Sequence, residues 1–307
     1  MFSYIAYDLI IQSDFSLPEL THIETRNTKP DITIRRVSPQ QLPSQLLTQE
    51  GYSIVNHYQI GINHPAGLIL VQNGHEILIA PSDNVEPKLL SNLITASALD
   101  AALLQRKFFL IHGSAVEIGG IAVAFIGETG YGKSTTAATF AAAQYPLLSD
   151  DTLAINMNRM TLHPAYPQIK LWPDSAEAVG QSPDELPKLY SLAEKRALRL
   201  QTEAKQQPIP LRQIYVLARD DYQHSVEPLS FSDSFTEILR HSYIGHLQYL
   251  YKVDLLTYTG QTEQHFRDCA KVAGMIRCYK LKRRWDLANV HELVNVVIND
   301  LHKHEVL

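Results

Sequence analysis

Residues 127–135 form the segment of this sequence whose residue types and spacing point most directly to chemistry. The segment is rich in glycine and ends in lysine, serine and threonine: Gly127, Glu128, Thr129, Gly130, Tyr131, Gly132, Lys133, Ser134 and Thr135. It satisfies the spacing G-x-x-x-x-G-K-[ST]. Glycines let the backbone wrap so that successive N–H groups point at phosphate oxygens, and the dipole of a following helix adds attraction. The pattern predicts a phosphate-binding loop.

Two side chains of this loop have separate roles in such a site. Lys133 supplies a full positive charge to the β- and γ-phosphates of ATP, and the Ser134 hydroxyl is a ligand for Mg²⁺. An ordinary glycine turn with an accidental lysine is the alternative, and the apolar strand predicted before the loop and the helix predicted after it argue against that alternative. A phosphate-binding loop predicts the ligand but not the reaction, because motor proteins, nucleotide-dependent switches and kinases all contain one.

Asp150 and Asp151 end the strand that follows the helix after this loop. Carboxylates beside a phosphate loop can divide two tasks, since one can hold Mg²⁺ and the other can accept a proton from an attacking hydroxyl. Two adjacent carboxylates also repel each other, so we expect one of them to have a raised pKa. A solvated acidic turn is the alternative interpretation.

His112 lies in the predicted strand 108–118, which leads into a tight turn at Gly119-Gly120. A lone histidine in an apolar strand is usually a hydrogen-bonded structural residue. The hairpin can instead return His112 to the phosphate loop, where it would contact the phosphates. The residues alone leave both interpretations open.

The elements that must position these residues divide into three parts. Residues 1–85 alternate short apolar runs with turn residues, including Asn73-Gly74 between two apolar runs, which predicts a hairpin within a small antiparallel β-rich domain. Residues 86–106 repeat apolar positions at helical spacing and predict a linking helix. Residues 107–307 run strand, loop, helix and strand, which predicts an α/β fold. Further predicted elements of this part are a strand at 209–218 and helices at 235–242, 264–276 and 286–301.

Three runs together resemble the catalytic core of HPr kinase/phosphorylase: residues 111–116, residues 127–134, and residues 147–151. The resemblance implies a P-loop core with the HPr kinase C-terminal and phosphoenolpyruvate carboxykinase-like fold. It also implies ATP- and Mg²⁺-dependent phosphoryl transfer to a serine-type hydroxyl. Carried over by position, it makes the four catalytic candidates Lys133, His112, Asp150 and Asp151. In these roles Lys133 binds the phosphates, and Ser134 and Asp150 contact Mg²⁺. Asp151 is the base, and His112 lines the phosphate site.

Three further runs resemble HPr-kinase-like proteins of peptide modification, such as lasso peptide precursor kinases: residues 4–7, 17–20 and 170–174. This resemblance implies a peptide or protein substrate, with a ribosomal precursor peptide as the acceptor. The chain departs from HPr kinase at Thr135, where that family has glutamate, and it lacks the later arginine-containing motif. HPr itself is therefore not implied as the substrate.

Two other function classes stay open. A kinase of small molecules can use the same core, and an enclosed acceptor pocket beside Asp151 would favour it. A nucleotide-binding regulatory protein without transferase activity would bind ATP and transfer nothing. For the arginine that stabilises the transferring phosphoryl group, the candidates are Arg196 and Arg284, with solvated surface runs as the alternative.

The charge, the apolar runs and the cysteine count of the chain limit the classes of partner that we expect. The 307-residue chain has a formal net charge of −5, whereas proteins that bind nucleic acid are usually basic, so we expect no nucleic-acid partner. No apolar run is long enough to cross a bilayer and the N-terminus lacks a basic leader, so we expect no membrane association. Cys269 and Cys278 are too few for a disulfide framework, and we expect free thiols and a cytoplasmic protein. The sequence leaves a homo-oligomer open.

Overall fold

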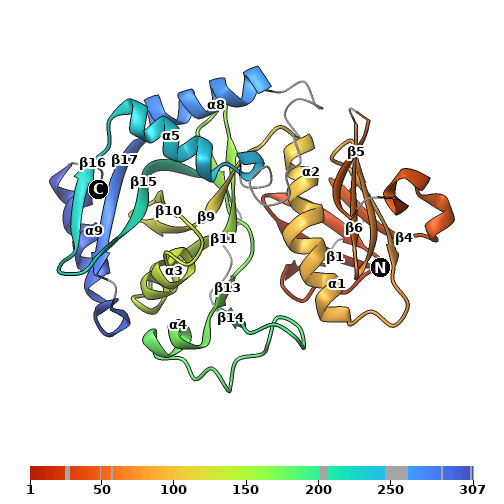
Figure 1. The fold of residues 1–307 in the computed structure, drawn as a ribbon, viewed down its shortest axis with the longest axis horizontal. Coiled ribbons are helices and arrows are strands. Elements are labelled where there is room, and N and C mark those ends of the chain that lie inside the picture. The colour runs from red at the N-terminus through yellow and green to blue at the C-terminus, as the bar shows by residue number, and fades with distance from the viewer. Residues whose placement is uncertain are drawn as a thin grey trace.

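The computed structural model describes residues 1–24, 28–48, 50–56, 58–200, 207–245, 262–284, 286–304 and 306. The chain is a mixed α/β protein with two large sheets that lie side by side, and a helical segment runs between them (Figure 1). Within these described ranges, none of the helices has the length and apolar character needed to span a membrane.

The N-terminal sheet has eight strands in the order β3-β1-β2-β4-β8-β7-β6-β5. Its strands are β1 (Phe2–Ala6), β2 (Leu9–Ser13), β3 (Thr21–His22), β4 (Ile32–Arg36), β5 (Gly51–Asn56), β6 (Gln59–His64), β7 (Gly67–Gln72) and β8 (Glu76–Pro81), with short 3₁₀ turns at η1 (Pro39–Gln41) and η2 (Ser44–Leu47). The predicted hairpin is confirmed, because β7 and β8 pair antiparallel around Asn73 and Gly74, whose φ angles of 55° and 66° suit a type I′ turn.

The expectation of a purely antiparallel N-terminal domain is wrong. Strand β4 lies between β2 and β8 and is parallel to both. Parallel neighbours need long connections in place of tight turns, and the chain supplies them in the segments between β2 and β4 and between β4 and β8. Alternation within single strands carries no information about these long connections.

The helical segment between the sheets is α1 (Pro87–Leu93), a π-helical turn η3 (Ile94–Ala98) and α2 (Leu99–Gln105). It packs in one hydrophobic cluster that joins N-terminal residues such as Ile11 and Ile69 to Leu110 and Ala154 of the second sheet and to Tyr243, which follows α5. The two sheets therefore share a continuous core through this segment, and the helix is a structural part of both.

The second sheet has seven strands in the order β10-β9-β11-β12-β15-β17-β16, with an additional pairing of β10 with β15. Its strands are β9 (Phe109–Ile118), β10 (Ile121–Ile126), β11 (Leu147–Asn156), β12 (Thr161–His163), β15 (Ile209–Asp220), β16 (Ser225–Pro228) and β17 (Arg277–Arg284). Strands β10, β15 and β17 run parallel to one another, while β9 is antiparallel to both β10 and β11. This arrangement places the end of β10 at Ile126 and the middle of β11 at Asp151 on either side of Gly113 of β9.

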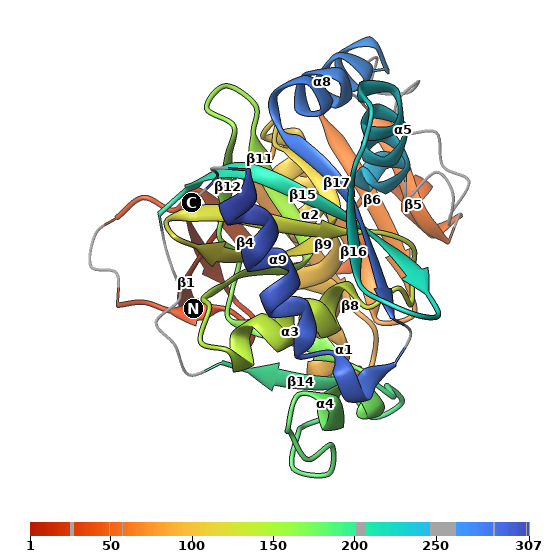
Figure 2. The same cartoon turned by 90° about the vertical axis from the view of Figure 1, so that its left-hand side faces the viewer.

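Helices cover both faces of the second sheet (Figure 2). Helices α3 (Lys133–Ala142) and α9 (Glu292–Lys303) contribute to the cluster on one face, and α5 (Phe231–His241) and α8 (Thr262–Met275) contribute to the cluster on the other. The predicted final helix is divided, because a 3₁₀ turn η4 (Leu287–Asn289) precedes α9. Cys269 and Cys278 are buried free thiols, as predicted.

A small two-stranded sheet stands beside α3. It consists of β13 (Gln168–Leu171) and β14 (Arg196–Arg199), with α4 (Pro173–Ala178) in the segment that connects them. The Arg199 guanidinium at the end of β14 donates to the backbone oxygens of Pro18 and Leu20 in the N-terminal part. This small sheet is thereby fixed between the two large ones.

Candidate active site

The glycine-rich loop connects the end of β10 to the first turn of α3. Gly132 adopts a left-handed conformation with φ of 81°, which favours glycine. A Cβ atom on Gly132 would lie 2.3 Å from a guanidinium nitrogen of Arg283, so a side chain at this position would displace the Arg283 guanidinium. The loop therefore presents its backbone, and the N-terminus of α3, to the space that the loop encloses.

The Lys133 side chain folds back over this loop. Its Nζ donates to the backbone oxygens of Gly127 at 2.9 Å and Glu128 at 3.1 Å, and the residue is only 8% exposed. Burial lowers the pKa of Lys133 from its ordinary value, and the nearby Asp151 and Asp150 carboxylates oppose that shift. The geometry holds one ammonium group inside the curve of the loop, where a bound phosphate would meet it.

Asp150 is buried and held from three sides. Its Oδ1 accepts a hydrogen bond from Ser114 Oγ at 2.7 Å, and its Oδ2 accepts one from the backbone N–H of Lys170 at 2.9 Å. The Ser134 side chain of the loop is also hydrogen-bonded to this carboxyl group. Burial first, and then the charge of Asp151, raise the pKa of Asp150. The oxygens of Ser134 and Asp150 are thus neighbours.

Asp151 has a different environment. Its Oδ2 lies 2.7 Å from Nζ of Lys170, and its own side chain is 27% exposed. Burial acts to raise the pKa of Asp151, but the Lys170 ammonium, with His112, outweighs burial and holds that pKa well below its usual range. The pKa of Asp150 is therefore raised and the pKa of Asp151 is lowered. One raised pKa is what the sequence predicts for two adjacent carboxylates.

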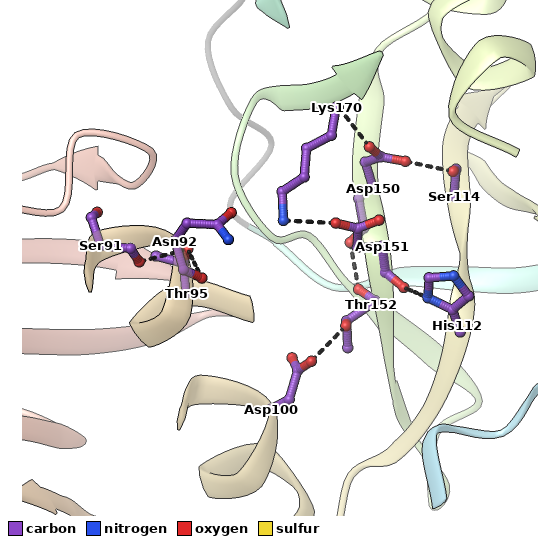
Figure 3. Close-up of polar contacts among 11 residues, drawn as sticks. Ser91, Asn92, Thr95, Asp100, His112, Ser114, Asp150, Asp151, Thr152 and Lys170 are labelled. Carbon is purple, nitrogen blue, oxygen red and sulfur yellow. Dashed lines mark hydrogen bonds and ion pairs between the residues drawn. The ribbon is translucent and has the colours of Figure 1, made fainter. Parts of the chain in front are cut away.

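His112 makes a structural hydrogen bond and also lies in the wall of the cavity beside the loop. Its Nδ1 lies 2.9 Å from the backbone oxygen of Asp151, and because a carbonyl oxygen only accepts, Nδ1 carries the hydrogen. The ring is half-buried and lines the same cavity as the loop. Figure 3 shows His112 on β9 and Asp151 on β11 facing each other, with Lys170 on the other side of the carboxylate.

These groups line a cavity of about 420 Å³. Of the residues proposed from the sequence, the walls include His112, Thr129, Gly130, Gly132, Lys133, Ser134, Thr135 and Asp151. Asp150, to which the Ser134 side chain is hydrogen-bonded, is not in the wall, and three loop residues also stay outside: Gly127, Glu128 and Tyr131. Gly127 is buried, Tyr131 packs against a hydrophobic cluster, and the exposed Glu128 carboxylate lies 3.5 Å from the guanidinium of Arg240.

The cations of the cavity differ from those expected. Arg196 donates to the backbone oxygen of Pro183 at 3.0 Å, and Arg284 forms an ion pair with Asp286 at 3.0 Å. Neither arginine is in the cavity wall, which contains Lys170, Lys195 and Arg283 in their place. The alternation of β17 carries a signal for Arg283, because it shares a face with the buried Tyr279 and Leu281.

The chemistry of the donor set fits a magnesium nucleotide. In the described part of the chain, no group of three or more histidine, cysteine, aspartate or glutamate side chains can hold a metal ion by itself. Mg²⁺ typically uses one or two protein oxygens and completes its shell with water and substrate phosphates. The adjacent oxygens of Ser134 and Asp150, beside a phosphate loop, match that requirement.

Comparisons with known proteins give distant likenesses among solved structures. No protein-family model matches the chain, and no curated protein matches it. Among solved structures, the HPr(Ser) kinase/phosphatase from Coxiella burnetii is similar over 64% of this chain and 98% of that chain, with 13% sequence identity and a TM-score of 0.30. A likeness at this TM-score leaves the reaction to be argued from the residues of the cavity.

Proposed function

We propose that this chain is an ATP- and Mg²⁺-dependent kinase that transfers the γ-phosphate to a serine-type hydroxyl of a peptide or protein. One observation carries the proposal: the glycine-rich loop, its inward-facing lysine and an Asp151 carboxylate paired with Lys170 line the same cavity. A nucleotide-binding protein needs the loop alone. A carboxylate held in its charged form opposite the loop supplies what transfer to a hydroxyl requires.

The cavity residues divide the work. The loop N–H groups and Lys133 bind the phosphates, and Ser134 and Asp150 hold Mg²⁺. When bound, Mg²⁺ neutralises phosphate charge and thereby supplies electrostatic stabilisation. Lys195 and Arg283 also line the cavity and add positive charge for the phosphoryl oxygens.

Asp151 orients the acceptor hydroxyl and takes its proton. A bond forms between the acceptor oxygen and the γ-phosphorus while the bond between that phosphorus and the oxygen of ADP breaks. The proton of the hydroxyl moves to the Asp151 carboxylate. Since phosphoryl transfer passes through a loose transition state, positioning and charge stabilisation supply most of the acceleration.

A ribosomal precursor peptide is the acceptor that we propose. The resemblance of residues 4–7, 17–20 and 170–174 to kinases of peptide modification supports it. Trp172 in the last of these runs lies in the cavity wall and is 46% exposed. An exposed aromatic side chain at the edge of a cavity offers a peptide an apolar contact.

The test is phosphorylation of candidate peptides. The protein is incubated with Mg²⁺, γ-labelled ATP and peptides encoded beside its gene, and the intact mass of each peptide is measured with Lys133→Ala as the control. A gain of one phosphate that the control lacks supports the proposal. A labelled small molecule would indicate a small-molecule kinase. ATP binding without transfer to any acceptor would indicate a regulatory protein.

A further inference from the structure

One lysine contacts both carboxylates of the cavity through different atoms. The backbone N–H of Lys170 donates to Asp150 Oδ2 at 2.9 Å, and its side-chain Nζ lies 2.7 Å from Asp151 Oδ2 (Figure 3). The main-chain contact does not depend on the side chain, whereas the ion pair does. Lys170 therefore fixes the two carboxylates separately.

The backbone of Lys170 is itself held in place. It lies in β13, where Lys170 is opposite Ala197 of β14. At the other end of that pairing, Arg199 binds the backbone oxygens of Pro18 and Leu20. Because the backbone of β13 is fixed in this way, the fold determines where the Lys170 side chain begins and where its ammonium group can lie.

Asp151 is the charged partner of this ammonium. The Lys170 side chain is 8% exposed, and a buried charge needs an opposite charge close by. Asp100 also lies near, but burial raises the pKa of Asp100 to about 8, so its neutral form predominates at pH 7. The Asp151 carboxylate, with its Oδ2 2.7 Å from Nζ of Lys170, is the ion-pair partner of this ammonium.

The backbone of Asp151 is strained and held from two sides. Its φ angle of 74° is left-handed, which is unfavourable for a residue with a Cβ. His112 donates to its carbonyl oxygen, and the next residue, Thr152, donates to Asp100 at 2.9 Å. Both contacts act on the backbone or on a neighbour. Among these contacts, the one from Lys170 touches the carboxylate itself.

We propose that Lys170 is a positioning residue of the transfer reaction, which holds the Asp151 carboxylate in place for the acceptor hydroxyl. The inference rests on the proposed kinase function and deepens it. Removal of the ammonium leaves the N–H bond to Asp150 intact, together with the phosphate loop. The loss should therefore fall on the rate of transfer and not on the binding of ATP.

The first test is Lys170→Met, which keeps the length of the side chain and removes its charge. We expect kcat to fall about 100-fold, the size expected for a misplaced catalytic group. The KM for ATP should stay unchanged, because the loop and the Asp150 contact remain. Lys170→Arg restores a cation and should recover part of the lost kcat. A wild-type kcat in Lys170→Met would overturn the inference.

A double-mutant cycle separates positioning from a general structural effect. The variants are Asp151→Asn, Lys170→Met and both together, and the double variant leaves no buried charge without a partner. If Lys170 acts through Asp151, the double variant transfers phosphate at the rate of Asp151→Asn alone. A further fall of about 100-fold in the double variant would show an independent role and overturn the inference.

The control is Lys188→Met, the same substitution at an exposed lysine in the segment between β13 and β14. It should transfer at the wild-type rate. Each variant is first shown to melt cooperatively, and the double variant is used if Lys170→Met does not fold. Absence of transfer by the wild type would overturn the proposed function and this inference together. Transfer by the wild type with no dependence on Lys170 would overturn the inference alone.

Discussion

The phosphate loop and the carboxylate cluster meet in one cavity but are built in opposite ways. The loop is local, because Lys133 bonds to residues only six and five positions earlier, Gly127 and Glu128. The cluster is assembled across the chain: Ser114 reaches Asp150 over 36 positions, and Thr152 reaches Asp100 over 52. The loop is therefore formed by residues close together in the sequence, whereas the carboxylate cluster is formed only when the chain folds.

Because of this difference, we expect substitutions in the loop and substitutions in the carboxylate cluster to have different effects. A loop that closes on itself can lose its ligand without affecting the sheets around it. The cluster joins the second sheet, the small sheet and the helix between the large sheets through Asp151, Lys170 and Asp100. Changes in the loop should therefore act on nucleotide binding, and changes in the cluster should act on transfer or on stability.

The largest effect is expected from Lys133→Ala in the loop. The substitution removes the ammonium that meets the phosphates, so the rise in melting temperature with Mg²⁺ and ATP should disappear and transfer should fall by about 10³-fold or more. Thermal shift and initial rates measure the two losses. Lys271→Ala, at an exposed lysine of α8, should retain both. An unchanged thermal shift in Lys133→Ala would show that the loop does not bind the nucleotide.

The next largest effect is expected from Asp151→Asn in the cluster. An amide cannot take the proton of the acceptor, so the rate of transfer should fall about 10³-fold. ATP binding should persist, because the loop is untouched. Asp184→Asn, at an exposed position, serves as the matched control. Wild-type turnover by Asp151→Asn would show that another group is the base.

A smaller effect is expected from His112→Ala. The variant loses the hydrogen bond from Nδ1 to the Asp151 backbone oxygen, and a bond of about 1 kcal/mol corresponds to a fall of roughly tenfold in rate at most. His112→Asn places an amide N–H near the same oxygen and should recover activity. Initial rates and melting curves measure both variants. Loss of the cooperative melt in His112→Ala would make the histidine structural only.

The last effect falls on stability and not on the transfer reaction, and it concerns the pH dependence at Asp100. Its folded-state pKa is about 8 against an ordinary value of 3.8, so between these values the folded chain keeps a proton that the unfolded chain releases. The free energy of unfolding therefore falls as pH rises through this window, by at most about 1.4 kcal/mol per pH unit. Asp100→Asn removes this contribution, and its melting temperature should fall less between pH 5 and pH 8. Parallel curves for the two proteins would contradict the assignment.

The sequence predicts the local part of the site well. Residues 127–135 define their own loop, and the apolar strand before it and the helix after it can be read from short-range patterns. The strand after that helix is found as well, but the expectation that Asp150 and Asp151 end it is wrong, because β11 continues through them to Asn156. Such features depend on residues within a few positions of one another.

The remaining features depend on contacts that no local pattern contains. Lys170 becomes part of the site because β13 lies beside Asp150 and Asp151 of β11. Strand β4 is parallel to its neighbours because of long connections. The alternation of β17 places Arg283 and not Arg284 on its buried face, but only the packing of that face against the loop brings Arg283 to the cavity. These facts require the arrangement of strands in space.

The most direct test of the central claim is single-turnover transfer from γ-labelled ATP to an accepted peptide by wild type and Asp151→Asn, with both proteins saturated with ATP. The account predicts that both bind ATP with similar affinity and that only the wild type delivers the phosphate at full rate. Loss of ATP binding in Asp151→Asn, or transfer at the wild-type rate, would contradict the separation of a binding loop from a transferring cluster.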